Sequence, residues 1–290
     1  MTTTLKHFAN VLIHSVQYSS QYIKNFNDQL QVSRKSDGSE VTQVDKLSQT
    51  YIFGIIYKYF PTINIIGEED TIEQISTENI PEYEYKDFPI EDKELELSEI
   101  TIYVDPLDGT SCFVKKEYEY VCVLVGALYK GKPFVGVISK PFHNCELFYA
   151  VENYHSEFPR EQTPEKIIFT SSKMNDIKDK ITEFPDPYEL HYIGGSGSKM
   201  ISIIQNKSDI YYHPVMQSCT WDTLACQVIL ELLGGKVCDV HGNDLQYPRK
   251  RTIDMVHRSG VVCMSARSVK YLPFIKEISK NILPFVKKEE

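Results

Sequence analysis

The sequence predicts an α/β protein of layered α+β type, built from two halves, residues 1–157 and 158–290. Three patterns carry this prediction. The first 60 residues repeat apolar side chains at helical spacing, the middle of the chain holds consecutive strand-like segments with short turns, and the last third alternates strand and helix patterns. Short connections between strands are typical of an antiparallel sheet, and alternation is typical of helices packed on a sheet.

The first half begins with two predicted helices. Apolar side chains recur three and four residues apart over residues 5–30 and, after a polar break, over 41–59, until Pro61 ends the pattern. A short apolar run over 63–66 indicates a strand. Residues 71–98 show no clean period and are expected to form a long surface loop.

Most strands of the first sheet are expected after this loop, at residues 101–105, 120–129, 134–139 and 146–151. The polar stretch 153–164 marks the expected boundary between the halves. Beyond it the patterns predict strands at 166–169, near 191, at 210–212, 236–240 and 260–264, with helices at 174–181, from 196, at 222–233 and toward 286.

The chain is acidic, but its acidity is local. It carries 31 Lys and Arg against 40 Asp and Glu, a net charge of −9. Residues 68–99 hold 13 acids and two lysines, or −11, so the rest of the chain sums to +2. Without a basic face, nucleic acid polymers and anionic membranes are not expected as partners.

The cysteines and the N-terminus indicate a cytoplasmic protein. Seven cysteines form no C-x-x-C pair, and several lie in apolar runs where a reduced thiol behaves as a small hydrophobic side chain. The N-terminus shows no signal-peptide pattern, and no apolar window is long enough to span a membrane.

The strongest chemical signal is the sequence Val-Asp-Pro-Leu-Asp-Gly-Thr at residues 104–110. Asp105 and Asp108, with the carbonyl of Leu107 between them, offer the all-oxygen ligand set that Mg²⁺ prefers. Gly109 and Thr110 follow, and their backbone amides and the Thr110 hydroxyl could donate hydrogen bonds to a bound anion. Taken alone, such a motif is more often an ordinary Asx-type turn with solvated aspartates.

Two more acids extend this candidate site. Glu68 follows the predicted strand 63–66 after a glycine, and Asp222 follows the only tryptophan, Trp221, where a helix begins. An Asp in a first helical turn is commonly only a cap. Together, however, these two acids and the aspartates of the 104–110 motif could hold two or three metal ions, an arrangement suited to phosphoryl transfer. A non-catalytic Ca²⁺-binding module is the alternative of a different class.

Other motifs are weaker. The glycine-rich stretch 194–199 fits neither common nucleotide-binding pattern. His213 and His241 are single histidines, which are more often structural than catalytic. No zinc-ligand spacing occurs.

In this order, residues 66–69, 104–110 and 221–222 resemble the signature of the inositol monophosphatase superfamily of Mg²⁺-dependent, Li⁺-sensitive phosphatases, and the resemblance spans nearly the whole chain. It implies an αβαβα five-layer sandwich with the metals between the antiparallel and α/β halves. It also implies Glu68, Asp105, Leu107, Asp108 and Asp222 as ligands of two or three Mg²⁺ ions, with Li⁺ as an inhibitor. Thr110, paired with Asp45 of the second helix, would orient and deprotonate the attacking water.

Within the superfamily, residues 65–70, 136–141, 194–199 and 234–247 most resemble the 3'(2'),5'-bisphosphate nucleotidases. This implies removal of the 3'-phosphate of adenosine 3',5'-bisphosphate, and of 3'-phosphoadenylyl sulfate, with inositol 1,4-bisphosphate as the alternative substrate and inositol monophosphate as a more distant one. The substrate contacts would be Gly109, Thr110, Ser196, Lys199, His213 and Lys173. Lys173 departs from the resemblance, because nucleotidases commonly have His at this position.

Overall fold

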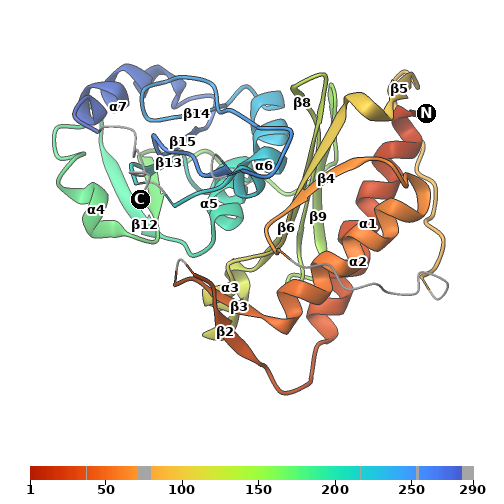
Figure 1. The fold of residues 1–290 in the computed structure, drawn as a ribbon. Helices are drawn as coiled ribbons and strands as arrows, with labels where there is room; N and C mark the ends of the chain where they lie inside the picture. Colours follow the sequence, from red (N-terminus) through yellow and green to blue (C-terminus); the bar gives the residue numbers. More distant parts are fainter. Residues whose placement is uncertain (37, 71–79, 216, 253–254, 283–290) are drawn as a thin grey trace.

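The computed structural model describes residues 1–36, 38–70, 80–215, 217–252 and 255–282, which form five layers (Figure 1). The first sheet has the strand order β10-β9-β8-β7-β6-β4 and the second the order β12-β11-β13-β15-β14. Helices α1 and α2 cover the first sheet, α5 and α6 lie between the sheets, and α4 and α7 cover the second. This confirms the predicted five-layer sandwich.

The strands of the first sheet are β4 (Asn64–Gly67), β6 (Ile100–Asp108), β7 (Cys122–Tyr129), β8 (Lys132–Lys140), β9 (Glu146–Val151) and β10 (Tyr154–His155). Those of the second are β11 (Ile167–Ser171), β12 (Tyr188–Tyr192), β13 (Ile210–His213), β14 (Lys236–Cys238) and β15 (Val261–Met264). The helices are α1 (Leu5–Asn25), α2 (Gln43–Tyr59), α3 (Thr110–Val114), α4 (Met174–Lys178), α5 (Ser196–Ile204), α6 (Thr220–Leu232) and α7 (Leu272–Ser279).

Helix α1 is shorter than its apolar pattern. The side chain of Thr4 accepts a hydrogen bond from the His7 amide at its start, and the helix ends at Asn25, where the amide of Phe26 bonds back to the Ile23 carbonyl. Phe26 and Leu30 nevertheless pack against the core. The predicted continuation to residue 30 was wrong, because apolar residues of the following loop have the same spacing as a helix face.

The first sheet is mostly antiparallel, as predicted, except that β4 pairs with β6 in parallel. All nine residues of β6 are buried. The strand continues to Asp108, so the prediction that it ends at Asp105 was wrong. The apolar and β-branched run ends at Val104, but the strand continues through the two aspartates, and the missing amide of Pro106 coincides with an irregularity in the pairing of β6 with β7.

Two glycines bring α6 unusually close to the first sheet. Gly126 of β7 and Gly136 of β8 face each other in register. A Cβ atom at Gly126 would lie 2.7 Å from the Ala225 amide nitrogen, and one at Gly136 would lie 2.3 Å from the Ala225 carbonyl oxygen. Because neither strand carries a side chain here, the first turns of α6 sit directly on the sheet, close to β6.

Several predicted bounds shift. The polar break after α1 forms a hairpin of β2 (Val32–Arg34) and β3 (Glu40–Thr42), and β1 (Thr2–Thr4) pairs with β5 (Glu94–Glu96) inside the predicted loop. Helices α4 and α7 end early, at Lys178 and Ser279, and residues 283–290 of the predicted last helix lie outside the described residues.

The predicted division at residues 157 and 158 falls between β10 and β11, and it stays a prediction, since α6 packs against strands of both sheets. No helix among the described residues is long and apolar enough to cross a membrane.

Candidate metal centre

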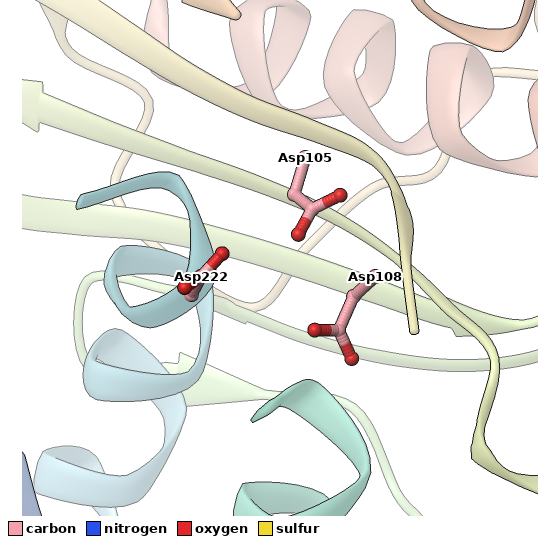
Figure 2. A group of neighbouring side chains, drawn as sticks. All are labelled: Asp105, Asp108 and Asp222. Atoms are coloured by element: carbon pink, nitrogen blue, oxygen red, sulfur yellow. The ribbon is translucent and has the colours of Figure 1, made fainter. Parts of the chain in front are cut away.

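Three aspartates converge where the end of β6 meets the first turn of α6 (Figure 2). Asp105 and Asp108 come from β6 and Asp222 from the first turn of α6. Carboxylate oxygens of the three lie within 4.8 Å of one another. Asp105 and Asp108 are buried, and Asp222 is partly exposed. Among the described residues this is the one group of three acidic, His or Cys side chains arranged to hold a metal ion.

A bulge in β6 allows two aspartates three residues apart to share one face. In a regular strand, alternation would send Asp105 and Asp108 to opposite faces of the sheet. Asp105 pairs with Leu124 and Asp108 with Cys122, so β6 has one more residue than β7 between these pairs. An inserted residue re-aims the side chains that follow it. The spacing in the sequence therefore becomes a shared site only through this irregularity.

Backbone amides fix two of the three carboxylates. Those of Ser196 and Gly197, at the start of α5, donate to the two oxygens of Asp108 at 2.9 Å each. The amide of Cys219 donates to Asp222 Oδ2 at 2.7 Å, as part of the cap of α6. Both helices therefore point their N-terminal amides, the positive ends of their dipoles, toward the aspartate cluster.

Gly195 makes the contact of α5 with Asp108 possible. Its φ is +63°, and a Cβ atom there would lie 2.7 Å from Asp108 Oδ2 and 2.6 Å from the Tyr120 carbonyl oxygen. Glycine alone avoids both the backbone strain and these collisions. Gly109, with φ at +85°, has a similar role, because a Cβ atom there would lie 2.8 Å from the same carbonyl oxygen.

The cluster resists being ionised. Burial, reinforced by the neighbouring carboxylates, raises the pKa of Asp105 well above its ordinary value and that of Asp222 to about 7. Burial also raises the pKa of Asp108 to about 6, although Lys199 and the amides of Ser196 and Gly197 oppose the shift. Lys199 offsets only part of the negative charge of these crowded carboxylates, and a hard divalent cation would supply more.

Glu68 stands beside this cluster. Its amide donates to the Val104 carbonyl at 3.0 Å, which ties it to β6, and its negative charge raises the pKa of Asp105. Its carboxylate is bound by Lys35 from the hairpin β2–β3, with Nζ 2.6 Å from Glu68 Oε1 and 2.7 Å from Glu69 Oε1. The sequence reasoning missed Lys35, which lies in what looked like a featureless polar break.

Asp45 and Thr110 meet as a pair. Thr110 Oγ1 donates to Asp45 Oδ1 at 2.7 Å and lies 3.2 Å from the Leu107 carbonyl oxygen. The other oxygen of Asp45 accepts from the amide and the hydroxyl of Thr42, at 2.8 and 2.5 Å. Asp45 is buried, and burial raises its pKa to about 6, against the opposing hydrogen bonds from Thr42 and Thr110.

Four of the predicted substrate contacts, Ser196, Lys199, His213 and Lys173, belong to the α/β half. Lys199 is buried, its Nζ donates to the Gly195 carbonyl at 2.8 Å and lies 5.2 Å from the centre of the Tyr211 ring, and burial lowers its pKa to about 8. His213 is buried against Tyr211, and burial, helped by the charges of Lys199 and Lys173, lowers its pKa to about 3. Lys173 is exposed and bonds to Gln217.

A cavity of about 740 Å³ opens beside the cluster. Asp222, Trp221, Glu68 and Lys35 line it, together with Arg251. Arg251 was also missed, because nothing in its local sequence marks it. Its guanidinium meets the Glu68 turn through contacts across more than 180 residues of chain.

Comparison with known proteins agrees with this architecture. Residues 5–272 match the sequence model of the Inositol monophosphatase family. The chain is 30% identical to 3'(2'),5'-bisphosphate nucleotidase 1 of Homo sapiens over 261 residues, which cover 83% of this chain and 84% of that one.

Two solved structures show the same fold. The extragenic suppressor protein suhB of Bartonella henselae superposes with a TM-score of 0.68 at 18% identity, covering 93% of this chain and 99% of that one. An IMPase/NADP phosphatase complexed with Mg²⁺ and phosphate superposes with a TM-score of 0.68 at 17% identity, covering 93% and 95%. Since the family match spans nearly the whole chain and the acidic cluster is present, this protein is a metal-dependent phosphomonoesterase of the inositol monophosphatase family.

Proposed function

We propose that this chain removes the 3'-phosphate of adenosine 3',5'-bisphosphate, and of 3'-phosphoadenylyl sulfate, in a Mg²⁺-dependent hydrolysis. The observation that carries the proposal is the convergence of three carboxylates with raised pKa values on one point, next to the Thr110–Asp45 pair and the start of α5. The likeness to the human nucleotidase supports the choice of substrate.

The donor set fits Mg²⁺. Asp105, Asp108 and Asp222 supply oxygen ligands, and a carboxylate cluster this crowded and buried needs a cation. The Leu107 carbonyl and the carboxylate of Glu68 would complete two or three ion positions, with Glu68 exchanging its ion pair with Lys35 for a metal. Bound there, Mg²⁺ would neutralise phosphate charge and make a water nucleophilic near neutral pH.

Thr110 and Asp45 would handle the proton of the attacking water. Since the Thr110 hydroxyl donates to Asp45 Oδ1, its lone pairs point outward and can accept a hydrogen bond from water. As the water attacks phosphorus, its proton would pass to Thr110 Oγ1 while the Thr110 proton passes to Asp45 Oδ1. Burial favours this second transfer, because it makes Asp45 a stronger base than an exposed aspartate.

The remaining residues would bind and orient the substrate. The amides of Gly109 and Thr110, at the start of α3, would hold phosphoryl oxygens. Ser196, Lys199 and His213, with Lys173 at the rim, would contact the sugar and the phosphate that is not removed. A non-reacting phosphate held this way helps to align the reacting one for in-line attack.

Phosphate release from three substrates tests the proposal. With Mg²⁺, kcat/KM should be highest for adenosine 3',5'-bisphosphate, lower for inositol 1,4-bisphosphate and lowest for inositol monophosphate, and Li⁺ should inhibit all three reactions. If the nucleotide is the poorest substrate, the choice of substrate is wrong. Inositol 1,4-bisphosphate is the second candidate, since exposed Lys173 suits a phosphate better than a base.

A further inference from the structure

Arg251 binds the turn that carries Glu68. It lies between β14 and β15, far along the chain from that turn. Its Nη1 donates to the carbonyl oxygens of Gly67 and Glu69 at 2.9 and 3.0 Å, and its Nη2 donates to that of Glu68 at 2.7 Å. One side chain therefore fixes three successive carbonyl groups.

The same guanidinium reaches the segment that carries Asp222. Its central carbon lies 5.5 Å from the centre of the Trp221 ring, a cation–π contact with the residue just before Asp222. Arg251 thus joins two of the chain segments that deliver acidic groups to the metal centre.

An ion pair alone does not explain this arrangement. Arg251 pairs with Asp70 at 2.7 Å, but the Asp70 side chain is 88% exposed, and exposed pairs contribute little to stability. The backbone contacts have a different effect. They occupy carbonyl oxygens and leave the carboxylates of Glu68 and Glu69 to Lys35 or to a metal ion. The planar guanidinium spreads its N–H donors over a rigid fork, so it can hold three carbonyl groups in fixed directions, whereas a lysine concentrates its donors on one flexible atom.

We infer that Arg251 is a positioning residue for the metal centre: it holds the Glu68 turn against Trp221 and so sets the affinity of the site for Mg²⁺. The inference rests on the proposed function, because it takes Glu68 and Asp222 as ligands. Arg251 itself touches neither carboxylate in the contacts above.

The test measures Mg²⁺ binding without turnover. Mg²⁺ should raise the Tm of the substrate-free protein, because an ion that binds the folded state stabilises it. In Arg251→Gln, the Mg²⁺ concentration giving half of the Tm shift should rise at least about tenfold. The fluorescence of Trp221, the only tryptophan, should shift to longer wavelength as its guanidinium cover is lost.

Arg249→Gln is the matched control. Arg249 lies two residues away and also donates to a backbone carbonyl, that of Ser98, but away from the cluster. It should leave both readouts unchanged. Arg251→Lys keeps the charge without the fork, so its half-shift concentration should still rise at least about threefold. If Arg251→Gln fails to fold, the Mg²⁺ response of Arg251→Lys decides whether Arg251 sets the affinity of the site.

The outcomes separate the two claims. An unchanged Mg²⁺ response in Arg251→Gln, or a wild-type response in Arg251→Lys, overturns the role of Arg251. No Mg²⁺ response in the wild-type protein overturns both that role and the metal centre. The expected Mg²⁺ and fluorescence responses, without phosphate release from any of the three substrates, support Arg251 and overturn the proposed function alone.

Discussion

Asp105 and Asp108 share a face of the first sheet because β6 contains one residue more than β7 between them. The sequence predicted that the two carboxylates lie together, which the structure shows, but through a turn rather than a bulged strand. Lys35 and Arg251 could not be predicted. Each acts on the Glu68 turn across at least 33 residues of chain, and no periodicity or motif encodes such a contact.

At the residue scale, the Thr110 hydroxyl should be required for catalysis. Thr110→Val keeps the shape of the side chain but cannot pass a proton to Asp45, so kcat should fall by about 10² or more. Thr110→Ser keeps the hydroxyl, and its kcat should stay within about tenfold of the wild-type value.

In the wild-type protein, kcat should decline below about pH 6 as Asp45 becomes protonated.

Steady-state rates across pH 5 to 8 provide the check. Equal rates for Thr110→Val and Thr110→Ser would exclude Thr110 from proton transfer. Circular dichroism spectra check that Thr110→Val is folded.

At the scale of elements, the N-termini of α5 and α6 complete the site. Sequence periodicity predicted both helices and placed their starts near Ser196 and Asp222, which the structure has at Ser196 and Thr220. Sequence periodicity could not show how close the two helices lie to β6, because this distance depends on glycines packed against other elements. Without side chains at Gly126 and Gly136, α6 can pack directly on the sheet, and without one at Gly195 the amides of α5 can reach Asp108.

Gly195→Ala should therefore damage both stability and activity. The added methyl meets Asp108 and the Tyr120 carbonyl and strains a positive φ, so α5 must move away from the cluster. We expect a loss of about 2 kcal/mol or more in the free energy of unfolding, with kcat/KM reduced at least about tenfold.

Gly131→Ala is the control. Its φ is +77°, and a Cβ atom there would meet nothing within 4 Å, so it carries the backbone strain alone. It should cost about 1 kcal/mol and leave kcat/KM unchanged. Urea unfolding and initial rates compare the two variants, and equal activity losses would show that the packing of Gly195 is unimportant.

At the scale of the whole molecule, the net charge of −9 conceals a specific use of acids. Glu68, Glu69 and Asp70, the first acids of the dense segment, are held by Lys35 and Arg251. Asp105, Asp108 and Asp222 have no such ion pair among the described contacts, and this imbalance is what a metal ion would correct.

Metal removal should make stability depend on pH in a particular direction. Because their pKa values are raised, the three aspartates bind protons more tightly in the folded chain than in the unfolded one. Between about pH 4 and pH 7 the folded state then holds more protons, so the free energy of unfolding falls as the pH rises. In EDTA, the drop from pH 5 to pH 7.5 should exceed about 1.4 kcal/mol, the equivalent of one pKa unit.

Mg²⁺ should abolish most of this drop, and Asp222→Asn should reduce it in EDTA, since one titrating group is gone while the amide oxygen can still cap α6. Urea titrations at pH 5 and pH 7.5 measure this difference in the free energy of unfolding. Metal-free protein that is as stable at pH 7.5 as at pH 5 would show that the cluster carries no uncompensated charge.

The central claim is that the three-aspartate cluster binds the Mg²⁺ required for phosphate release. The most direct measurement compares release from adenosine 3',5'-bisphosphate, with Mg²⁺, by the wild-type protein and by Asp105→Asn. Asparagine keeps the shape and can still accept the Leu107 amide, which lies 3.1 Å from Asp105 Oδ1, but it removes a buried negative charge. We predict a folded variant whose rate is lower by at least about 10³. A folded Asp105→Asn protein that releases phosphate at the wild-type rate would contradict it.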